Sequence, residues 1–182
     1  MLFLDEIQNY EPFDDTEREF KDRVLTLLDK HKGDANVFDR SHLEGHITGS
    51  ALVVNKTRDK VYMILHKKLG FWMQPGGHCD GDADVAAGAL REVIEETGLK
   101  DVELVPHIFD IDIHPVPEMQ KNGKTEPAHD HFDVRYLVIA NEDEVPSLQE
   151  EEILNGKWFT IEEAAKTNPW RNFTRMLDKI MA

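Results

Sequence analysis

The sequence predicts an α/β (α+β) fold in which helices sandwich a mixed β-sheet, and three observations lead to this prediction. Amphipathic helical patterns occupy residues 13–32 and 161–181, near the two ends of the chain. A third helical pattern occupies residues 84–97, and apolar strand patterns stand before and after it. Because strands and helices intermingle in this way, we expect one sheet with helices on both of its faces.

The first helical pattern runs over residues 13–32. Its apolar stripe consists of Phe20, Val24, Leu27 and Leu28. Thr16 and Glu19 have the spacing of a capping box, and Gly33 is the expected stop. We interpret residues 1 to about 40 as a helical extension at the N-terminus of a single domain that comprises the whole chain, residues 1–182.

Strand patterns follow at residues 46–54, 61–66, 107–113, 131–140 and near 158–160. A polar turn, residues 55–60, joins the first two of these strands. A loop rich in Gly and Asp, residues 70–82, precedes the central helix, which Gly98 is expected to cap at its C-terminus. The C-terminal helical segment is expected to be interrupted near Asn168-Pro169, because proline cannot continue a helix.

The chain is acidic, since 36 Asp and Glu residues against 21 Lys and Arg residues give a formal net charge of −15. Such a surface repels phosphate backbones, which argues against nucleic acid as a partner. The apolar runs are too short to span a membrane, and the acidic start lacks the basic segment of a secretory signal. With Cys79 as the single cysteine, no internal disulfide can form, and a cytoplasmic location is expected.

Three carboxylates share one side of the central helix. At about 100° per residue, Glu92, Glu95 and Glu96 fall on one arc. The opposite, apolar arc holds Ala86, Leu90, Val93 and Ile94. Like charges at these spacings destabilise a helix unless solvent screens them or a cation binds them. Clustered carboxylate oxygens suit Mg²⁺ or Mn²⁺, and the Gly-rich loop just before the helix favours the cation site over a solvated face.

The same segment carries a resemblance to a known family. Residues 91–99 read REVIEETGL, and Gly77 lies upstream at the matching spacing. This stretch resembles the Nudix box, G-x5-E-x7-R-E-U-x-E-E-x-G-U, where U is a bulky aliphatic residue, and it matches eight of the nine elements. The resemblance implies a Nudix fold over roughly residues 46–166. It also implies a hydrolase that cleaves the diphosphate linkage of a nucleoside diphosphate linked to a moiety X.

Transferred residue by residue, the resemblance implies that Glu92, Glu95 and Glu96 bind Mg²⁺ or Mn²⁺. It further implies that the Gly76 carbonyl adds a metal ligand and that Arg91 orients the glutamates within the catalytic set. The implied partner is a small-molecule diphosphate of the ADP-ribose, nucleotide sugar or nucleoside triphosphate type, and the sequence does not choose among them. Many members of the family form homodimers, and the oligomeric state stays open here.

One position departs from the family pattern. The first glutamate of the box falls on Ala83, with Asp82 and Asp84 beside it. In the family this glutamate supports the geometry of the loop and helix, so either a neighbouring aspartate substitutes for it or the loop is held differently. The family also takes a metal ligand or general base from a later loop. Five glutamates qualify, and the sequence leaves them equivalent: Glu142, Glu144, Glu150, Glu151 and Glu152.

Polar residues alternate with apolar residues along two later strand patterns. In residues 109–114 the polar set is Asp110, Asp112 and His114, and the apolar set is Phe109, Ile111 and Ile113. In residues 129–136 the polar set is His129, His131 and Asp133, and the apolar set is Phe132, Val134 and Tyr136. These polar faces either contact solvent or line a cleft for substrate or a second metal. The substrate-binding candidates are His46, His78, His114, His129, His131 and Asp133.

Two alternatives to hydrolysis remain. Isopentenyl diphosphate isomerases share the Nudix fold and bind a metal through histidines at places comparable to His46 and His78. Those enzymes protonate an alkene with a cysteine just before the Gly-His pair, where this chain has Gly76, whereas Cys79 lies after the histidine. The second alternative is a non-catalytic Nudix-like module that binds nucleotides, which is expected when the box glutamates are lost. All three are present here, which favours hydrolysis.

Overall fold

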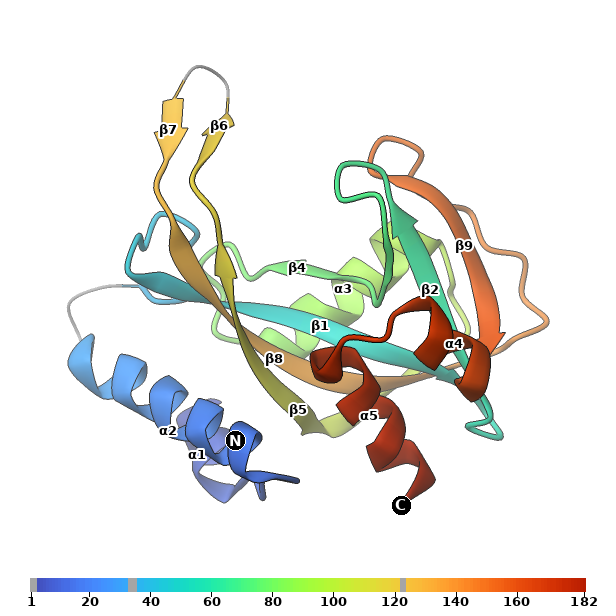
Figure 1. Ribbon diagram of the computed structural model, residues 1–182, viewed down its shortest axis with the longest axis horizontal. Coiled ribbons are helices and arrows are strands. Elements are labelled where there is room, and N and C mark those ends of the chain that lie inside the picture. Colours follow the sequence, from blue (N-terminus) through green and yellow to red (C-terminus); the bar gives the residue numbers. More distant parts are fainter. Residues whose placement is uncertain (1–2, 33–35, 122–123) are drawn as a thin grey trace.

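The computed structural model describes residues 3–32, 36–121 and 124–182. Within these residues, seven strands form one sheet whose main path runs in the order β3-β2-β1-β8-β5, while β4 pairs with β1 and β9 with β2 (Figure 1). The strands of this sheet are β1 (Gly45–Asn55), β2 (Lys60–His66), β3 (Trp72–Met73), β4 (Gly76–His78), β5 (Val102–Val116), β8 (His129–Ala140) and β9 (Ile153–Thr160). Two short strands, β6 (Met119–Lys121) and β7 (Lys124–Glu126), form a ribbon that extends the β5–β8 hairpin away from the body.

Strand β1 lies at the centre of the sheet. It runs parallel to β8 along its whole length, whereas the other strand pairs are antiparallel, so the sheet is mixed. The opposite edge of β1 pairs first with β4, at Thr48 and His78, and then with β2, at Val53 and Tyr62. All of β1 is buried, as expected for a strand covered on both faces.

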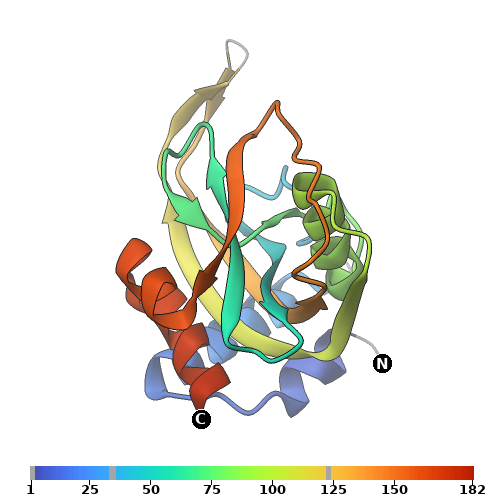
Figure 2. The same cartoon turned by 90° about the vertical axis from the view of Figure 1, so that its right-hand side faces the viewer.

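Helices cover both faces of this sheet. They are α1 (Phe3–Asn9), α2 (Asp15–Lys30), α3 (Val85–Thr97), α4 (Ile161–Thr167) and α5 (Arg171–Met181). Figure 2 shows α3 on one side of the sheet and α4 with α5 on the other. The predicted mixed sheet between helices is therefore confirmed, as are the central helix and the break between the two C-terminal helices.

The core follows these layers. On one face, residues of α1, α2 and the start of α3 pack against β1, β5 and β8, with Ile47, Ile111 and Val134 fully buried among them. Farther along the same face, Val93 of α3 packs with β1, β2 and β8. On the opposite face, Phe173 of α5 packs with apolar residues of β1, β2, β8 and β9. The half of this opposite face near the start of β1 is polar, and there the structure departs from an ordinary core.

The N-terminal helix begins differently from the prediction. Helix α2 starts at Asp15, and the side chain of Asp14 caps it by accepting a hydrogen bond from the main-chain nitrogen of Glu17. The predicted capping box of Thr16 and Glu19 is therefore wrong, because Asp14, two residues earlier, supplies the oxygen that the first amides need. Helix α1 lies within the predicted helical extension, although no separate helix was predicted there. Gly33, the predicted stop, lies outside the described residues.

The strands are longer and more numerous than predicted. The strand predicted over 107–113 extends over all of β5, and its register against β8 shifts on both sides of Ile108. This shift corrects one predicted face, because Phe109 packs on the α5 side while Ile111 and Ile113 pack on the α3 side. The loop predicted over 70–82 contains the short strands β3 and β4.

The apolar arc predicted for the central helix is also shifted. Ile94, which was expected to be in the core, is 40% exposed. Glu96, which was expected on the outer arc, is 4% exposed. On this side the helix meets β4, where the amide of Gly76 donates to Glu96 and Gly77 lies close to Glu92.

Candidate functional site

The carboxylates of α3 meet the main chain of β4. The main-chain nitrogen of Gly76 donates a 3.0 Å hydrogen bond to a carboxylate oxygen of Glu96. A Cβ atom added at Gly77 would lie 2.6 Å from Cδ of Glu92, and one at Gly76 would lie 2.2 Å from Cβ of Ser50. Both glycines are therefore required by close approach, and they bring the backbone of β4 directly beside two of the glutamates.

These carboxylates are in an unusual electrostatic environment. Burial raises the pKa of Glu96 to about 8, against the lowering effect of the Gly76 hydrogen bond, and the charges of Glu92, Glu152 and Glu95 add to the rise. Burial likewise raises the pKa of Glu92, although Arg91 acts in the opposite direction. The side chain of Glu95 is 54% exposed and faces the solvent side of the same cluster. The local surroundings thus disfavour the accumulation of negative charge unless a cation is present.

Arg91 links the helix to β4. Its Nη2 atom donates hydrogen bonds of 3.0 Å to the carbonyl of His78 and to Oε1 of Glu92. Its Nε atom lies 3.8 Å from Glu95. The guanidinium therefore bonds one carboxylate and the main chain of β4 and lies within reach of a second carboxylate, while its orienting role stays a prediction.

The loop before α3 is held without the first glutamate of the box. Asp84 caps the helix by accepting a 3.0 Å hydrogen bond from the main-chain nitrogen of Ala87, and Asp82 accepts one from that of Asp84. Asp80 forms an ion pair with Arg40. Neighbouring aspartates therefore support the turn around Ala83, and they do so through the helix cap rather than through an ion pair with the box arginine.

In the structure, the five glutamates that follow β8 differ in their contacts. Glu142 pairs with Lys60, and Glu144 accepts hydrogen bonds from the main-chain nitrogens of Lys100 and Asp101, so both are engaged elsewhere. Glu152 is close enough to Glu96 for its charge to contribute to the raised pKa. The loop itself is anchored to the end of α3 by a hydrogen bond from the main-chain nitrogen of Gln149 to the Glu96 carbonyl.

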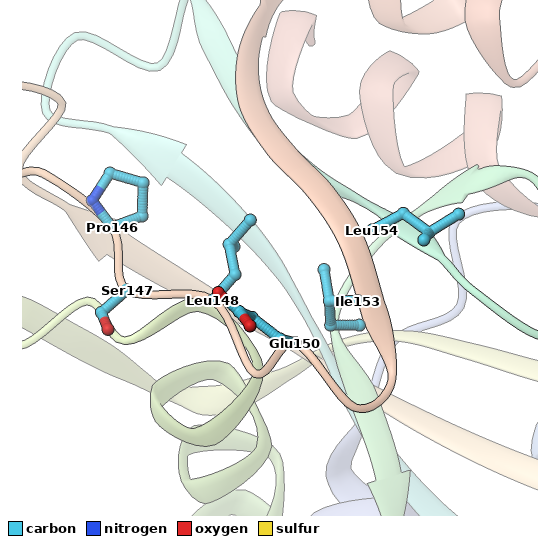
Figure 3. A pocket seen from close by; sticks show the side chains of 6 residues that line it. All are labelled: Pro146, Ser147, Leu148, Glu150, Ile153 and Leu154. Atoms are coloured by element: carbon cyan, nitrogen blue, oxygen red, sulfur yellow. The ribbon is translucent and has the colours of Figure 1, made fainter.

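A shallow depression follows this loop but does not coincide with the carboxylates. Figure 3 shows the side chains that line it: Pro146, Ser147, Leu148, Glu150, Ile153 and Leu154. Its lining contains none of the α3 glutamates and no histidine. Among the later glutamates, Glu150 thus borders this depression, whereas the charge of Glu152 contributes to the raised pKa of Glu96.

A comparison with models of known protein families assigns the chain to one of them. The model of the NUDIX domain matches residues 45–177. This chain belongs to the NUDIX family. The matched range includes β4 and α3 with all three box glutamates, and α1 and α2 lie before it.

Curated relatives place this NUDIX protein among the pyrophosphohydrolases. An RNA pyrophosphohydrolase of Pelagibacter ubique (strain HTCC1062) is 26% identical over 121 residues, which cover 63% of this chain and 76% of the relative. A probable DHNTP pyrophosphohydrolase of Lactococcus lactis subsp. cremoris (strain MG1363) is 31% identical over 98 residues, which cover 54% of this chain and 56% of the relative. The second match thus spans little more than half of that relative. The expected enzyme class, a Nudix pyrophosphohydrolase, is confirmed.

Solved structures agree on the fold. A C. elegans Ap4A hydrolase in a binary complex has a TM-score of 0.56 at 18% identity, covering 74% of this chain and 94% of that chain. A NUDIX family hydrolase from Clostridium perfringens has a TM-score of 0.51 at 25% identity, covering 73% and 96%. These likenesses confirm the predicted Nudix fold.

The second polar face of this NUDIX protein divides into two parts. In the first part, Asp133 accepts hydrogen bonds from the hydroxyls of Thr48 and Ser50 and from Nε of Arg135, so its oxygens are engaged within the protein. Asp110 and Asp112 also pair with Arg135, which is 2% exposed. The aspartates on this face thus surround a buried guanidinium, and Asp133 is less available to a ligand than predicted.

Arg135, Arg175 and Lys179 were not predicted as partners of this face. Arg175 and Lys179 project from α5 and both reach Asp110. Alternation along β8 places Arg135 on the same face as His131 and Asp133, so its position on this face could have been predicted from the sequence. The approach of α5 is a tertiary contact between distant segments, and no local pattern indicates it.

The second part consists of histidines. The rings of His46, His78, His129 and His131 have centroids 4.8–5.2 Å apart in the pairs that contact, and His114 lies 5.4 Å from His131. The structure therefore brings all five predicted histidines together.

Cys79 lies apart from both polar clusters. It is buried in the apolar core with Ile47 and Val85, and burial raises the pKa of its thiol to about 12. Such a thiol is a poor proton donor to a bound alkene, which weighs against the isomerase alternative. None of the described helices has the length and apolar character needed to cross a membrane.

Proposed function

We propose that this chain is a metal-dependent hydrolase that cleaves the diphosphate linkage of a nucleoside diphosphate linked to a moiety X. The observation that carries the proposal is the junction of β4 and α3. There Glu96 is buried against the Gly76 amide, and Glu92 is packed against the backbone of Gly77. Carboxylates so close together and so little hydrated are costly in a fold unless they serve a cation.

The donors at this junction fit Mg²⁺ or Mn²⁺, because they are carboxylate and carbonyl oxygens rather than sulfur or imidazole. The ion would be held by Glu92, Glu95 and Glu96, with the carbonyl of Gly76 as a further ligand. When bound, such an ion supplies charge neutralisation for a diphosphate and lowers the pKa of a coordinated water.

Two other residues have supporting roles in this proposal. Arg91 positions Glu92 by donating to it and to the carbonyl of His78, so the carboxylate and β4 keep a fixed separation. Glu152 is our candidate for the carboxylate that accepts the proton of the attacking water, because its charge contributes to the raised pKa of Glu96. Glu142 and Glu144 are instead bound to Lys60 and to the main chain of Lys100.

The net charge of the chain and the names of the relatives both bear on which substrate we propose. The relatives are named for cleaving a pyrophosphate group from RNA and from DHNTP. A net charge of −15 disfavours long nucleic acid chains, so we favour a small nucleotide whose phosphates a cation can screen. ADP-ribose, nucleotide sugars and nucleoside triphosphates all meet this description.

The test is release of phosphate or nucleotide from a panel of these compounds, with dinucleoside polyphosphates and isopentenyl diphosphate added. The full chain is assayed with Mg²⁺, with Mn²⁺ and with chelator, beside Glu95→Gln, Glu96→Gln and the exposed control Glu103→Gln. We expect metal-dependent turnover that falls by about 100-fold or more in both box variants, the size expected for a lost catalytic carboxylate, and not in the control.

Other outcomes would contradict the proposal. Rates equal to wild type in both box variants would exclude the carboxylate site. Metal-dependent nucleotide binding without turnover of any compound would indicate the non-catalytic module. Conversion of isopentenyl to dimethylallyl diphosphate would indicate the isomerase. Sedimentation velocity on the same samples measures the oligomeric state, which the sequence leaves open.

A further inference from the structure

Histidines from four adjacent strands gather on the sheet face opposite α3. In the register of the sheet, His46 of β1 and His114 of β5 are both partners of His131 in β8. His78 of β4 is the partner of Thr48, two residues along β1 from His46. Because paired residues point to the same side of a sheet, the strand order β4-β1-β8-β5 itself assembles these rings.

Two ring nitrogens in this group are buried without a partner. His46 is fully buried and His129 is 7% exposed, and within the described part of the chain the Nε2 atom of each lacks a hydrogen-bond partner. The Nδ1 atom of His129 lies 2.9 Å from the carbonyl of Pro127, and that of His46 lies 3.4 Å from the carbonyl of His42. A carbonyl can only accept, so both Nδ1 atoms carry the proton and both Nε2 atoms present lone pairs.

Lone pairs that are buried without a hydrogen-bond donor cost free energy. They are, however, the arrangement in which histidine binds metals, with one nitrogen oriented by a carbonyl and the other directed at the ion. The nearby aspartates do not offer an alternative explanation, because Asp112 and Asp133 are paired with Arg135.

We propose that His46, His129 and His131 form a binding site for a divalent transition metal, separate from the box glutamates. Their candidate ligand atoms all lie within 4.8 Å of one another, so small ring rotations bring them onto one ion. Three imidazoles suit Zn²⁺ and its first-row neighbours and are poorly suited to Mg²⁺, which prefers oxygen. The rings of His78 and His114 border the site, 5.2 and 5.4 Å from that of His131.

The charge state of the site agrees with this assignment. Burial, followed by the charges of the neighbouring histidines, lowers the pKa of His131 to about 2. Burial also lowers the pKa of His46. Burial thus favours the neutral form of these two rings, which is the form that binds a metal.

The two sites share one strand. The carbonyl of His78 accepts from Arg91, and Gly76 donates to Glu96, while the His78 ring contacts those of His46 and His131. A transition metal on the imidazole side and Mg²⁺ or Mn²⁺ on the carboxylate side would thus flank β4. The imidazole site depends on none of the box glutamates, so it can be tested independently of the proposed hydrolysis.

The experiment uses the full chain without an affinity tag, stripped with chelator and then titrated with Zn²⁺ and with Co²⁺. Bound metal is measured by mass spectrometry after desalting, and Co²⁺ also by its visible absorption. We expect one tightly held ion per chain, retained in excess Mg²⁺ and in the Glu92→Gln/Glu96→Gln double variant. His46→Gln and His129→Gln should each weaken binding by at least about 10-fold to 100-fold, the loss caused by changing even an outer partner of a ligand.

His107 provides the matched control, since it is an exposed histidine on β5, and His107→Gln should bind as wild type. Affinity unchanged in both His46→Gln and His129→Gln would overturn the proposal, as would a wild-type chain that retains no Zn²⁺. If the variants fail to fold, X-ray absorption of the wild-type Zn²⁺ form decides. Scattering from about three imidazoles is expected for this donor set, and a shell made of oxygen alone would overturn it.

Discussion

Asp110 in β5 and Arg175 in α5 form a buried ion pair with two hydrogen bonds of 2.8 Å. The two side chains are 0% and 1% exposed, and Arg135 and Lys179 contact the same carboxylate. This cluster lies next to the aspartates of the polar face and attaches the C-terminal helix to the sheet. Through Arg135 it also links β5 to β8, the two strands that carry His114, His129 and His131.

Replacing this carboxylate is expected to be costly. Asp110→Asn leaves three buried cations with too little compensating charge, so the free energy of unfolding should fall by about 3–5 kcal/mol. Urea denaturation measures the change. The control is Asp178→Asn, which breaks an exposed ion pair between Asp178 and Arg171 and should cost at most about 1 kcal/mol. Equal losses in the two variants would show that burial of the cluster is not what matters.

The pKa of Asp110 predicts how the free energy of unfolding depends on pH. Burial acts to raise the pKa of Asp110, but the Arg175 hydrogen bond and the nearby charges of Arg135, Lys179 and Arg175 outweigh it, so the pKa is lowered. The folded state therefore binds fewer protons than the unfolded state, in which an aspartate titrates near about 3.9. The contribution is present above that pH and is lost as the pH falls through the lower, folded-state pKa.

This pH dependence can be isolated by comparison. The free energy of unfolding of the wild type should fall more steeply below about pH 4 than that of Asp110→Asn, which has no carboxyl to titrate there. Urea titrations of both chains at a series of acidic pH values measure the difference. Parallel curves would mean that Asp110 does not have a lowered pKa.

Gly77 is expected to be essential for activity rather than for folding. An alanine Cβ would lie 2.6 Å from Cδ of Glu92 and displace that carboxylate, so Gly77→Ala should lower kcat by up to about 100-fold. Gly88 in α3 has nothing within 4 Å of an added Cβ. Gly88→Ala should therefore keep full activity and raise the free energy of unfolding by about 0.5–1 kcal/mol. Full activity in Gly77→Ala would contradict the close packing of β4 on α3.

The later loop allows a paired test of the proton acceptor. Glu152→Gln should lower kcat by about 100-fold or more if Glu152 accepts the proton, with a much smaller change in KM. Glu142→Gln should leave kcat unchanged, because Glu142 pairs with Lys60 away from the box. Steady-state kinetics on the best compound of the panel distinguish them, and the reverse order would assign the role to another glutamate.

Glu17 links the N-terminal helices to the rest of the chain. It is fully buried and accepts hydrogen bonds from Tyr10, from the main chain of Ile111 and from Lys179. Glu17→Gln should lower the free energy of unfolding by about 3–5 kcal/mol, whereas the exposed Glu19→Gln should have little effect.

The same residue tests the prediction of a single domain. The three tryptophans, at positions 72, 158 and 170, all lie outside α1 and α2, so their fluorescence follows the body of the protein. If the extension and the body unfold together, fluorescence and circular dichroism should give one coincident transition in wild type and in Glu17→Gln. Separate transitions would show that the extension folds independently.

The features that could be predicted from the sequence are those that depend on local chemistry. The central helix, its Gly98 cap and the β1 and β2 strands follow from short-range propensity and periodicity, and the structure confirms them. The spacing of the box glutamates relative to Gly77 identified the family before any contact was known. The predicted capping box at Thr16 was wrong because two nearby side chains can each cap the helix, and Asp14, two residues earlier, is the one that does so.

Other features depended on contacts between distant segments. The register shifts in β5 moved Phe109 to the opposite face, which no alternation pattern indicates. Our proposal of Glu152 rather than Glu142 as the proton acceptor rests on the path of the later loop across the end of α3.

The sequence by itself determined the family, the enzyme class and which residue types are present, since these are encoded in spacing along the chain. The tertiary structure decided which of these residues contact one another. It buried Glu96, directed Arg135 and Arg175 to the aspartates, and left two imidazole nitrogens buried without a hydrogen-bond partner among the described residues. The reason is physical: hydrogen bonds, desolvation and ion pairs act over a few ångströms in space, and only the parallel pairing of β1 with β8 brings residues 46 and 131 within that range.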